Sequence, residues 1–199
     1  MKVLLLLFLF TNIFASDKYS LRVAYGEVSK TDLGEILSGD ISGYNYDLSV
    51  LALDAGYLLG EAIYELPIDL YVKTSLSYFN EDDLQDDIYE GTLFIKAYWN
   101  IDFFKNRVRF GFGEGVSDTS DILYTEYIEV QENGDNTSHL LNYLDISLDF
   151  DIGRAFSYKP LFGTALGMAI KHRSGVFGLF NNVSHGGSNY NTFYIEKNF

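Results

Sequence analysis

Apolar and polar residues alternate with a period of two along most of this 199-residue chain, and the 3.6-residue period of an amphipathic helix is hard to find. In residues 68–78 the even positions are mostly apolar and the odd positions polar, and residues 108–113 and 144–152 repeat the pattern. Near Val50-Leu51 the apolar phase slips by one residue, which we interpret as a β-bulge. Together with further runs, the sequence predicts an all-β fold of eight strands. The further runs are residues 19–28, 44–58, 88–102, 159–174 and 189–199.

Alternation alone fits a soluble β-sandwich or a membrane β-barrel, because each has one apolar face per strand. The barrel is favoured because the runs reach about 10 residues, enough to cross a membrane when tilted. In addition, the chain ends on an aromatic residue, Phe199, and long connections alternate with short ones. We therefore expect an eight-stranded antiparallel transmembrane β-barrel of the bacterial outer membrane, with both termini periplasmic and the long loops outside the cell. The long connections are residues 29–43, 80–87, 118–137 and 175–188.

The first residues have the pattern of a secretory signal. Met1-Lys2 precedes an apolar run, and Ala15 offers a small residue for cleavage. We therefore divide the chain into a signal peptide, residues 1–15, and a barrel, residues 16–199. The chain has no cysteine and a net charge of −14. These features exclude disulfides and thiolate metal sites, and they argue against nucleic acid as a partner.

Many charged residues fall on the strand face that should point into the barrel. Eight strands leave an interior just wide enough for side chains, so opposite charges are expected to pair there. Gly111, Gly113, Gly163 and Gly167 share this inward parity and would relieve crowding. The charged residues with inward parity are Asp69, Lys73, Lys96, Arg107, Arg109, Asp145, Asp149, Asp151, Lys171, Arg173 and Glu196.

Strand 159–174 ends in a pair of residues that can carry chemistry. Its even positions belong to the lipid face, so His172 and Ser174 point outward at the level of the outer leaflet. Residues two apart on a strand lie about 6.5 Å from each other, near enough for an imidazole to reach a hydroxyl. Serine is a weak nucleophile until such a base removes its proton. The competing interpretation is an ordinary polar strand end at the lipid headgroups.

Three asparagines share this outward face. By parity, Asn189 and Asn191 in strand 189–199 lie beside the His172 strand, and Asn142 lies on its other side at the same level. An Asn amide can orient an imidazole as a carboxylate does, or it can donate to an oxyanion. Asn189 is our first candidate for either role, and a turn residue is the competing reading. No residue of this set requires a metal or cofactor.

The arrangement resembles the PagL family of lipid A 3-O-deacylases. The resemblance rests on His-x-Ser near the end of the seventh strand, a Gly/Asn-rich loop and a last strand ending in Phe199. It implies an outward Ser174 nucleophile with His172 as its base, acting without metal on the 3-O acyl ester of lipid A in lipopolysaccharide. Two positions depart from the family. Gly175 stands where the family has an oxyanion-binding Asn, and no acidic residue occurs between Ser174 and Glu196.

The leading hypothesis is thus an outer-membrane serine esterase that deacylates lipid A, with Gly175 and Asn189 beside the oxyanion. The alternative is a non-enzymatic, OmpA-like small barrel or an adhesin that acts through its extracellular loops. The acidic loop 81–87 could bind divalent cations, but a solvated loop is the favoured interpretation. His139 and His185 are interpreted as surface residues, and Trp99 with Phe103-Phe104 as an interfacial aromatic girdle.

Overall fold

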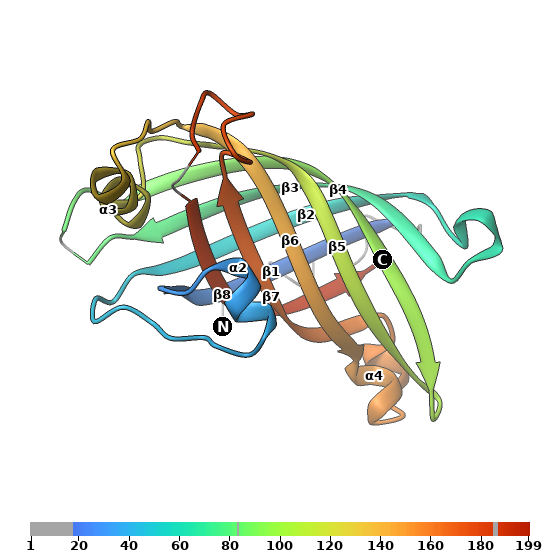
Figure 1. The fold of residues 1–199 in the computed structure, drawn as a ribbon. Coiled ribbons are helices and arrows are strands. Elements are labelled where there is room, and N and C mark those ends of the chain that lie inside the picture. Colours follow the sequence, from blue (N-terminus) through green and yellow to red (C-terminus); the bar gives the residue numbers. More distant parts are fainter. Residues whose placement is uncertain (1–17, 83, 185–186) are drawn as a thin grey trace.

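A computed structural model describes residues 18–82, 84–184 and 187–199, and the predicted signal peptide lies outside them. The described chain is a closed antiparallel β-barrel in strand order β1 to β8, and β1 pairs with β8 to close it (Figure 1). The predicted fold class is therefore confirmed. The strands are β1 (Tyr19–Ser29), β2 (Ser49–Gly60), β3 (Ile68–Asn80), β4 (Ile88–Phe103), β5 (Asn106–Thr119), β6 (Leu140–Asp151), β7 (Thr164–Ser174) and β8 (Gly187–Asn198).

Short helices lie in the connections between strands. The β1–β2, β3–β4, β5–β6 and β7–β8 connections form one end of the barrel, here called the outer-loop end. At this end α2 (Leu33–Leu37) follows β1 and α3 (Tyr124–Asn133) follows β5 (Figure 1). At the opposite end η1 (Ile63–Glu65) follows β2, and α4 (Ile152–Ala155) and η2 (Lys159–Leu161) follow β6. None of the helices in the described residues is long and apolar enough to cross a bilayer.

The two faces of each strand differ as the alternation predicts. In β3, Lys73, Ser75 and Ser77 are buried inside the barrel while Leu76 is exposed on the outer wall. Trp99 and Phe103 are exposed near the end of β4, in agreement with an aromatic girdle. The apolar outer wall thus surrounds a polar interior, the reverse of a soluble β-sandwich.

The predicted bulge at Val50-Leu51 is wrong. The β1–β2 register runs without a break through these residues, and the irregularity in β2 lies between Leu58 and Gly60. The apolar phase slips because Val50 points into the barrel mouth, where it belongs to a buried cluster with Phe79 and Tyr190. An inward apolar residue at the mouth therefore imitates a bulge in the sequence pattern.

Strand β7 begins later than predicted. Residues 152–163 form α4, η2 and a turn, so the strand starts at Thr164 instead of residue 159. Gly163, predicted to be an inward strand residue, lies in this turn with φ of 73°. Glycine reaches this left-handed conformation without the steric cost that other residues carry. Because the alternation of β7 starts only after the turn, the facing of its later residues is unaffected.

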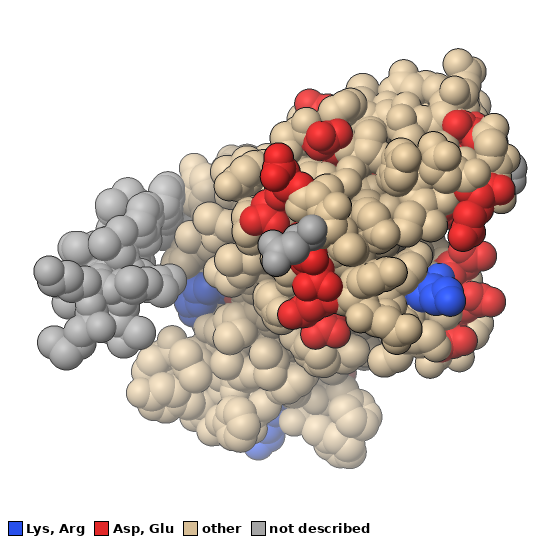
Figure 2. Space-filling model, turned by 90° about the vertical axis from the view of Figure 1, so that its left-hand side faces the viewer, with Lys and Arg blue, Asp and Glu red and all other residues tan. Residues whose placement is uncertain are grey.

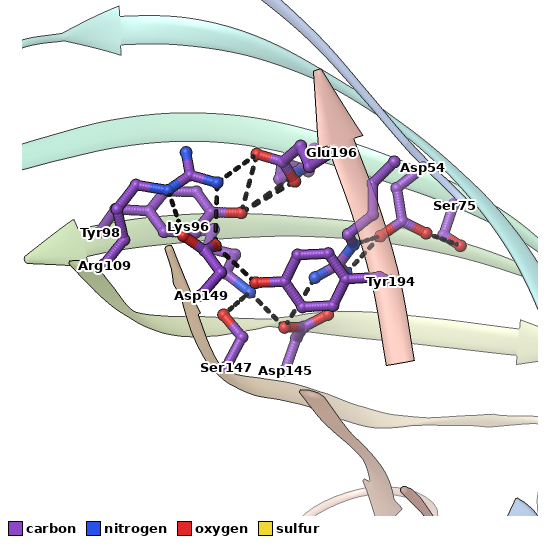
Figure 3. Close-up of polar contacts among 12 residues, drawn as sticks. Asp54, Ser75, Lys96, Tyr98, Arg109, Asp145, Ser147, Asp149, Tyr194 and Glu196 are labelled. Carbon is purple, nitrogen blue, oxygen red and sulfur yellow. Dashed lines mark hydrogen bonds and ion pairs between the residues drawn. The ribbon is translucent and has the colours of Figure 1, made fainter. Parts of the chain in front are cut away.

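A buried ion-pair network fills the middle of the barrel (Figure 3). Arg22 binds both Asp54 and Asp145, and Lys96 also contacts Asp145. In a second group, Arg109 donates from Nε to Asp149 at 2.8 Å and from Nη2 to Glu196 at 3.2 Å, beside Tyr98 and Tyr194. Most of the predicted inward charges thus form buried ion pairs, some of them with acids and an arginine that were not predicted. The predicted charges that pair in this way are Lys73, Lys96, Arg109, Asp145, Asp149, Lys171, Arg173 and Glu196, and the additional partners are Arg22, Asp54, Glu90 and Glu126. Asp69, Arg107 and Asp151 are less buried and line a small pocket at the end opposite the outer loops.

Removing one partner of this network should destabilise the barrel strongly. Asp145→Ala leaves Lys96 buried without its ion-pair partner and Arg22 with one carboxylate in place of two. The expected loss is about 3–5 kcal/mol of unfolding free energy, because an uncompensated buried charge is costly. Urea unfolding of the refolded barrel, followed by gel mobility, measures it. The exposed Asp102→Ala is the control, and an equal loss in both variants would contradict the expectation.

Candidate active site

The candidate site lies on the outer wall where β7 meets the outer-loop end. His172 pairs with Leu144 of β6 and with Asn189 of β8, and Ser174 pairs with Asn142 and Gly187. Leu166 and Met168 occupy the same face lower on β7 and are 40% and 55% exposed. His172 and Ser174 therefore continue the apolar, outward column of this strand, while Lys171 is buried in the interior.

Asn189 fixes the orientation of the His172 ring. The Asn189 side-chain oxygen lies 2.7 Å from His172 Nδ1, and its nitrogen donates to the main-chain carbonyl of Thr31 at 3.1 Å. A carbonyl can only accept, so this second bond requires the amide nitrogen to face Thr31 and the oxygen to face the ring. His172 Nδ1 must then donate. In the neutral ring, Nε2 consequently keeps its lone pair and can act as a base.

A groove of about 580 Å³ runs past these residues. One part of its lining is polar and contains His172, Ser174 and Asn189. Another part is apolar and contains Leu33, Leu144, Val176 and Phe177. A groove with a candidate nucleophile between polar and apolar walls suits an amphipathic ester.

The other predicted site residues differ in position. Asn142 and Gly175 line the groove with Ser174, and Asn142 is only 6% exposed. The Asn142 amide nitrogen makes one long contact, 3.4 Å, with the main-chain oxygen of Gly115. Asn191 pairs with Ile170 and Glu27 lower on the wall and does not belong to the described lining of the groove. The structure thus brings Asn142 and Gly175 to His172 and leaves Asn191 apart.

Gly175 is held in a position that admits no side chain. A Cβ atom built there would lie 2.0 Å from the carbonyl oxygen of Val183. The loop folds back at this point, with Phe180 donating its N–H to Gly175 O at 2.9 Å. Gly175 therefore cannot be exchanged for the Asn of the resembling family without moving the loop, so a side-chain donor at this position is excluded and only its backbone remains.

Sequence reasoning missed three carboxylates at the groove. Asp32, Glu114 and Glu129 line it from the β1–β2 loop, β5 and α3. Glu114 pairs with Leu144, which in turn pairs with His172, so strand parity and register could have located it. Asp32 and Glu129 lie in the connections between strands, Glu129 within α3, and alternation does not place such residues. Figure 2 shows acidic side chains spread over the outer-loop end of the molecule.

The other polar features of the sequence have structural roles. His139 Nδ1 contacts the main-chain oxygen of Thr119 at 2.8 Å, and His185 lies outside the described residues. In the acidic loop, Glu81 accepts hydrogen bonds from the Tyr124 main chain and the Gln85 side chain, which attaches the start of α3 to the barrel. Burial raises the pKa of Glu81. Within the described residues, no cluster of three His or acidic side chains is placed to bind a metal.

Comparisons with known proteins identify the fold. No family model and no curated protein sequence matches the chain. The crystal structure of the outer membrane enzyme PagL is similar, with a TM-score of 0.61 and 11% identity over 90% of this chain and 99% of that one. The crystal structure of Neisserial surface protein A (NspA) is also similar, with a TM-score of 0.52 and 13% identity over 92% and 98%. At these identities the likeness concerns architecture alone, and the chain has the fold of an eight-stranded outer-membrane β-barrel.

Proposed function

We propose that this protein is a serine esterase of the outer membrane that removes an ester-linked acyl chain, at the 3-O position, from lipid A. The observation that carries the proposal is the fixed chain from Thr31 through Asn189 to His172, two residues from Ser174 on the outer wall. A purely structural polar strand end would not require an oriented imidazole beside a hydroxyl and a groove. The similar fold of the enzyme PagL gives the proposal independent, though architectural, support.

The residues can be given roles in an acyl-transfer reaction. Ser174 Oγ attacks the ester carbonyl while His172 Nε2 takes its proton, and His172 then returns this proton to the departing sugar oxygen. Water, activated by the same imidazole, releases the fatty acid from Ser174. Asn189 keeps the ring aligned throughout, with less stabilisation of the imidazolium than a carboxylate would provide.

The hydrogen bonds of the two groove asparagines favour a different role for each of them. The Asn189 nitrogen is engaged by Thr31, which favours the orienting role over oxyanion binding. Asn142 lies directly opposite Ser174 in the β6–β7 pair, and its nitrogen has only one long contact. We therefore assign the oxyanion to Asn142 and the Gly175 main-chain N–H, whose strand-end position faces the same groove.

A non-enzymatic surface protein is the second candidate. It is supported by the similar fold of Neisserial surface protein A and by the large outer-loop end with its acidic surface (Figure 2). In this case the barrel would present loops to an extracellular partner, and the residues around Ser174 would serve only to end β7. The two functions make opposite predictions for the lipid.

Mass spectrometry of lipid A separates the two functions. Gram-negative cells that express the wild type should contain lipid A lighter by one acyl chain, and cells that express Ser174→Ala or His172→Ala should not. The control is His139→Ala, which changes a histidine whose side chain contacts Thr119 and does not belong to the described lining of the groove. Lipid A that is unchanged by folded wild-type protein in the outer membrane would eliminate the deacylase and leave the surface protein.

A further inference from the structure

The candidate nucleophile lies at an exposed end of the β-sheet. Ser174 pairs with Gly187 on the last rung of the β7–β8 ladder, and His172 pairs with Asn189 two rungs below. Terminal rungs open more easily than central ones, because they have neighbours on one side only. A reaction that depends on the distance between two side chains needs its backbone fixed. The proposed reaction therefore requires contacts that fix this end of the ladder.

Arg173, between the two candidate catalytic residues, attaches β7 to the opposite side of the barrel mouth. Its side chain points inward and is almost fully buried. Arg173 Nε donates to Glu126 of α3 at 2.8 Å, and Nη2 donates to the main-chain oxygen of His139 at 3.2 Å. Further contacts reach Glu90 of β4 and Ser117 of β5. One side chain thus links the end of β7 to α3 and to strands across the interior.

Helix α3 holds β8 at the same level. The Ser188 hydroxyl donates to the same Glu126 oxygen at 2.8 Å, and the Gly187 main-chain N–H donates to Glu129 at 3.0 Å. Ser188 pairs with Arg173, and Gly187 pairs with Ser174. Two acids on successive turns of one helix therefore bind both strands of the two last rungs.

The helix is itself fastened to the barrel. Leu123, its N-terminal flanking residue, is fully buried in the apolar cluster at the barrel mouth. The Tyr124 main-chain N–H donates to Glu81 at 2.9 Å. Because these contacts fix α3 to the barrel, the hydrogen bonds of α3 can hold the end of the ladder in one position, whereas a free loop could not.

We propose that α3 is a positioning element for the Ser174 site, acting through Glu126 and its ion pair with Arg173 and through Glu129. Neither Glu126 nor Arg173 belongs to the described lining of the groove. The pair closes the last rungs of the β7–β8 ladder and so fixes the backbone that carries both Ser174 and His172. This inference rests on the proposed esterase function for its catalytic consequence, whereas the closure of the ladder stands without it.

The test variant is Glu126→Gln, and its control is Lys171→Gln. The control removes a buried charge from the face of β7 that also carries Arg173, but Lys171 has no contact to α3 among its described hydrogen bonds. Both purified barrels are first shown to be folded by heat-modifiable gel mobility. Amide hydrogen exchange at residues 173–175 and 187–189 is then measured, together with kcat and KM on micellar lipid A. Glu126→Gln should speed exchange there about tenfold or more and lower kcat by about tenfold to a hundredfold, with little change in KM. The control should change neither.

A second variant tests whether the contacts of Arg173 matter, and not only the charge at Glu126. Arg173→Lys keeps the charge but not the several-pronged contact, so its kcat and its exchange rate should lie between those of Glu126→Gln and the wild type. Unchanged exchange at the last rungs in Glu126→Gln would overturn the inference, whether or not the wild type hydrolyses lipid A. Faster exchange with kcat unaffected in an active enzyme would also overturn it. An inactive wild type would instead refute the proposed function, and exchange alone would then decide whether α3 closes the ladder.

Discussion

Ser174→Ala is expected to lower the rate of lipid A deacylation by at least about a thousandfold, because the variant lacks the hydroxyl beside His172 that would form the acyl intermediate. His172→Ala should cost about as much, since the serine is not activated without its base. The double variant should be no slower than either single one, because residues that act as one unit lose their effect together. Initial rates on purified lipid A in detergent micelles, with released fatty acid quantified, provide the measurement.

The control for this set is Ser184→Ala, which removes a hydroxyl that lines the same groove from the β7–β8 connection, outside the strand that carries His172 and Ser174. It should retain the wild-type rate within about twofold, the range usual for a surface change away from the reacting groups. Additive losses in Ser174→Ala and His172→Ala would contradict a shared role. They would show that the two side chains act separately, for example by binding the headgroup.

Asn189→Ala is expected to lower kcat by about tenfold to a hundredfold, because His172 would lose the partner that fixes its ring and its tautomer. Asn189→Asp should fall between alanine and the wild type. A carboxylate could still accept from His172 Nδ1, but its other oxygen would face the Thr31 carbonyl, where the amide now donates at 3.1 Å. The gain of charge is therefore opposed by the loss of the bond that holds the side chain.

Thr31→Ala is the matched control for Asn189, because Asn189 contacts the main-chain oxygen of Thr31 and not its side chain. It should leave kcat within about twofold of the wild type, as expected for a change that removes no contact of the site. The rates are measured on the same micellar lipid A at saturating substrate. An Asn189→Asp variant faster than the wild type would mean that Thr31 does not anchor the side chain, and that the protein functions with a suboptimal third partner.

Strand parity predicted the facing of the site because the side-chain period of a strand is two and each outward column continues without interruption. Lys171 and Arg173 inside, with His172 and Ser174 outside, follow directly from it. The same rule failed at Val50, where an apolar residue belongs to the interior cluster of the barrel mouth. Parity reports which face a residue takes, but it does not report what that face touches.

The loops were beyond sequence reasoning for a different reason. Helix α3 has few buried residues, and it is located by partners distant in the chain, such as Glu81 for Tyr124 and Arg173 for Glu126. The groove carboxylates Asp32 and Glu129 likewise line the groove with His172 although they are distant from it in the chain. Between Ser174 and Glu196 strand parity offers Asn189 and Asn191 as partners of His172 but no carboxylate, since the groove carboxylates lie in parts of the chain distant in sequence.

The interior of the barrel also has a consequence for the cell. Arg22, Asp145 and Lys96 close the centre of the lumen with side chains that are fully buried and paired. In the described barrel, these side chains occupy the centre of the lumen, and lipid ester chemistry would take place on the outer wall, apart from this interior. Many copies of a barrel filled in this way could lie side by side in one membrane without adding pores to it.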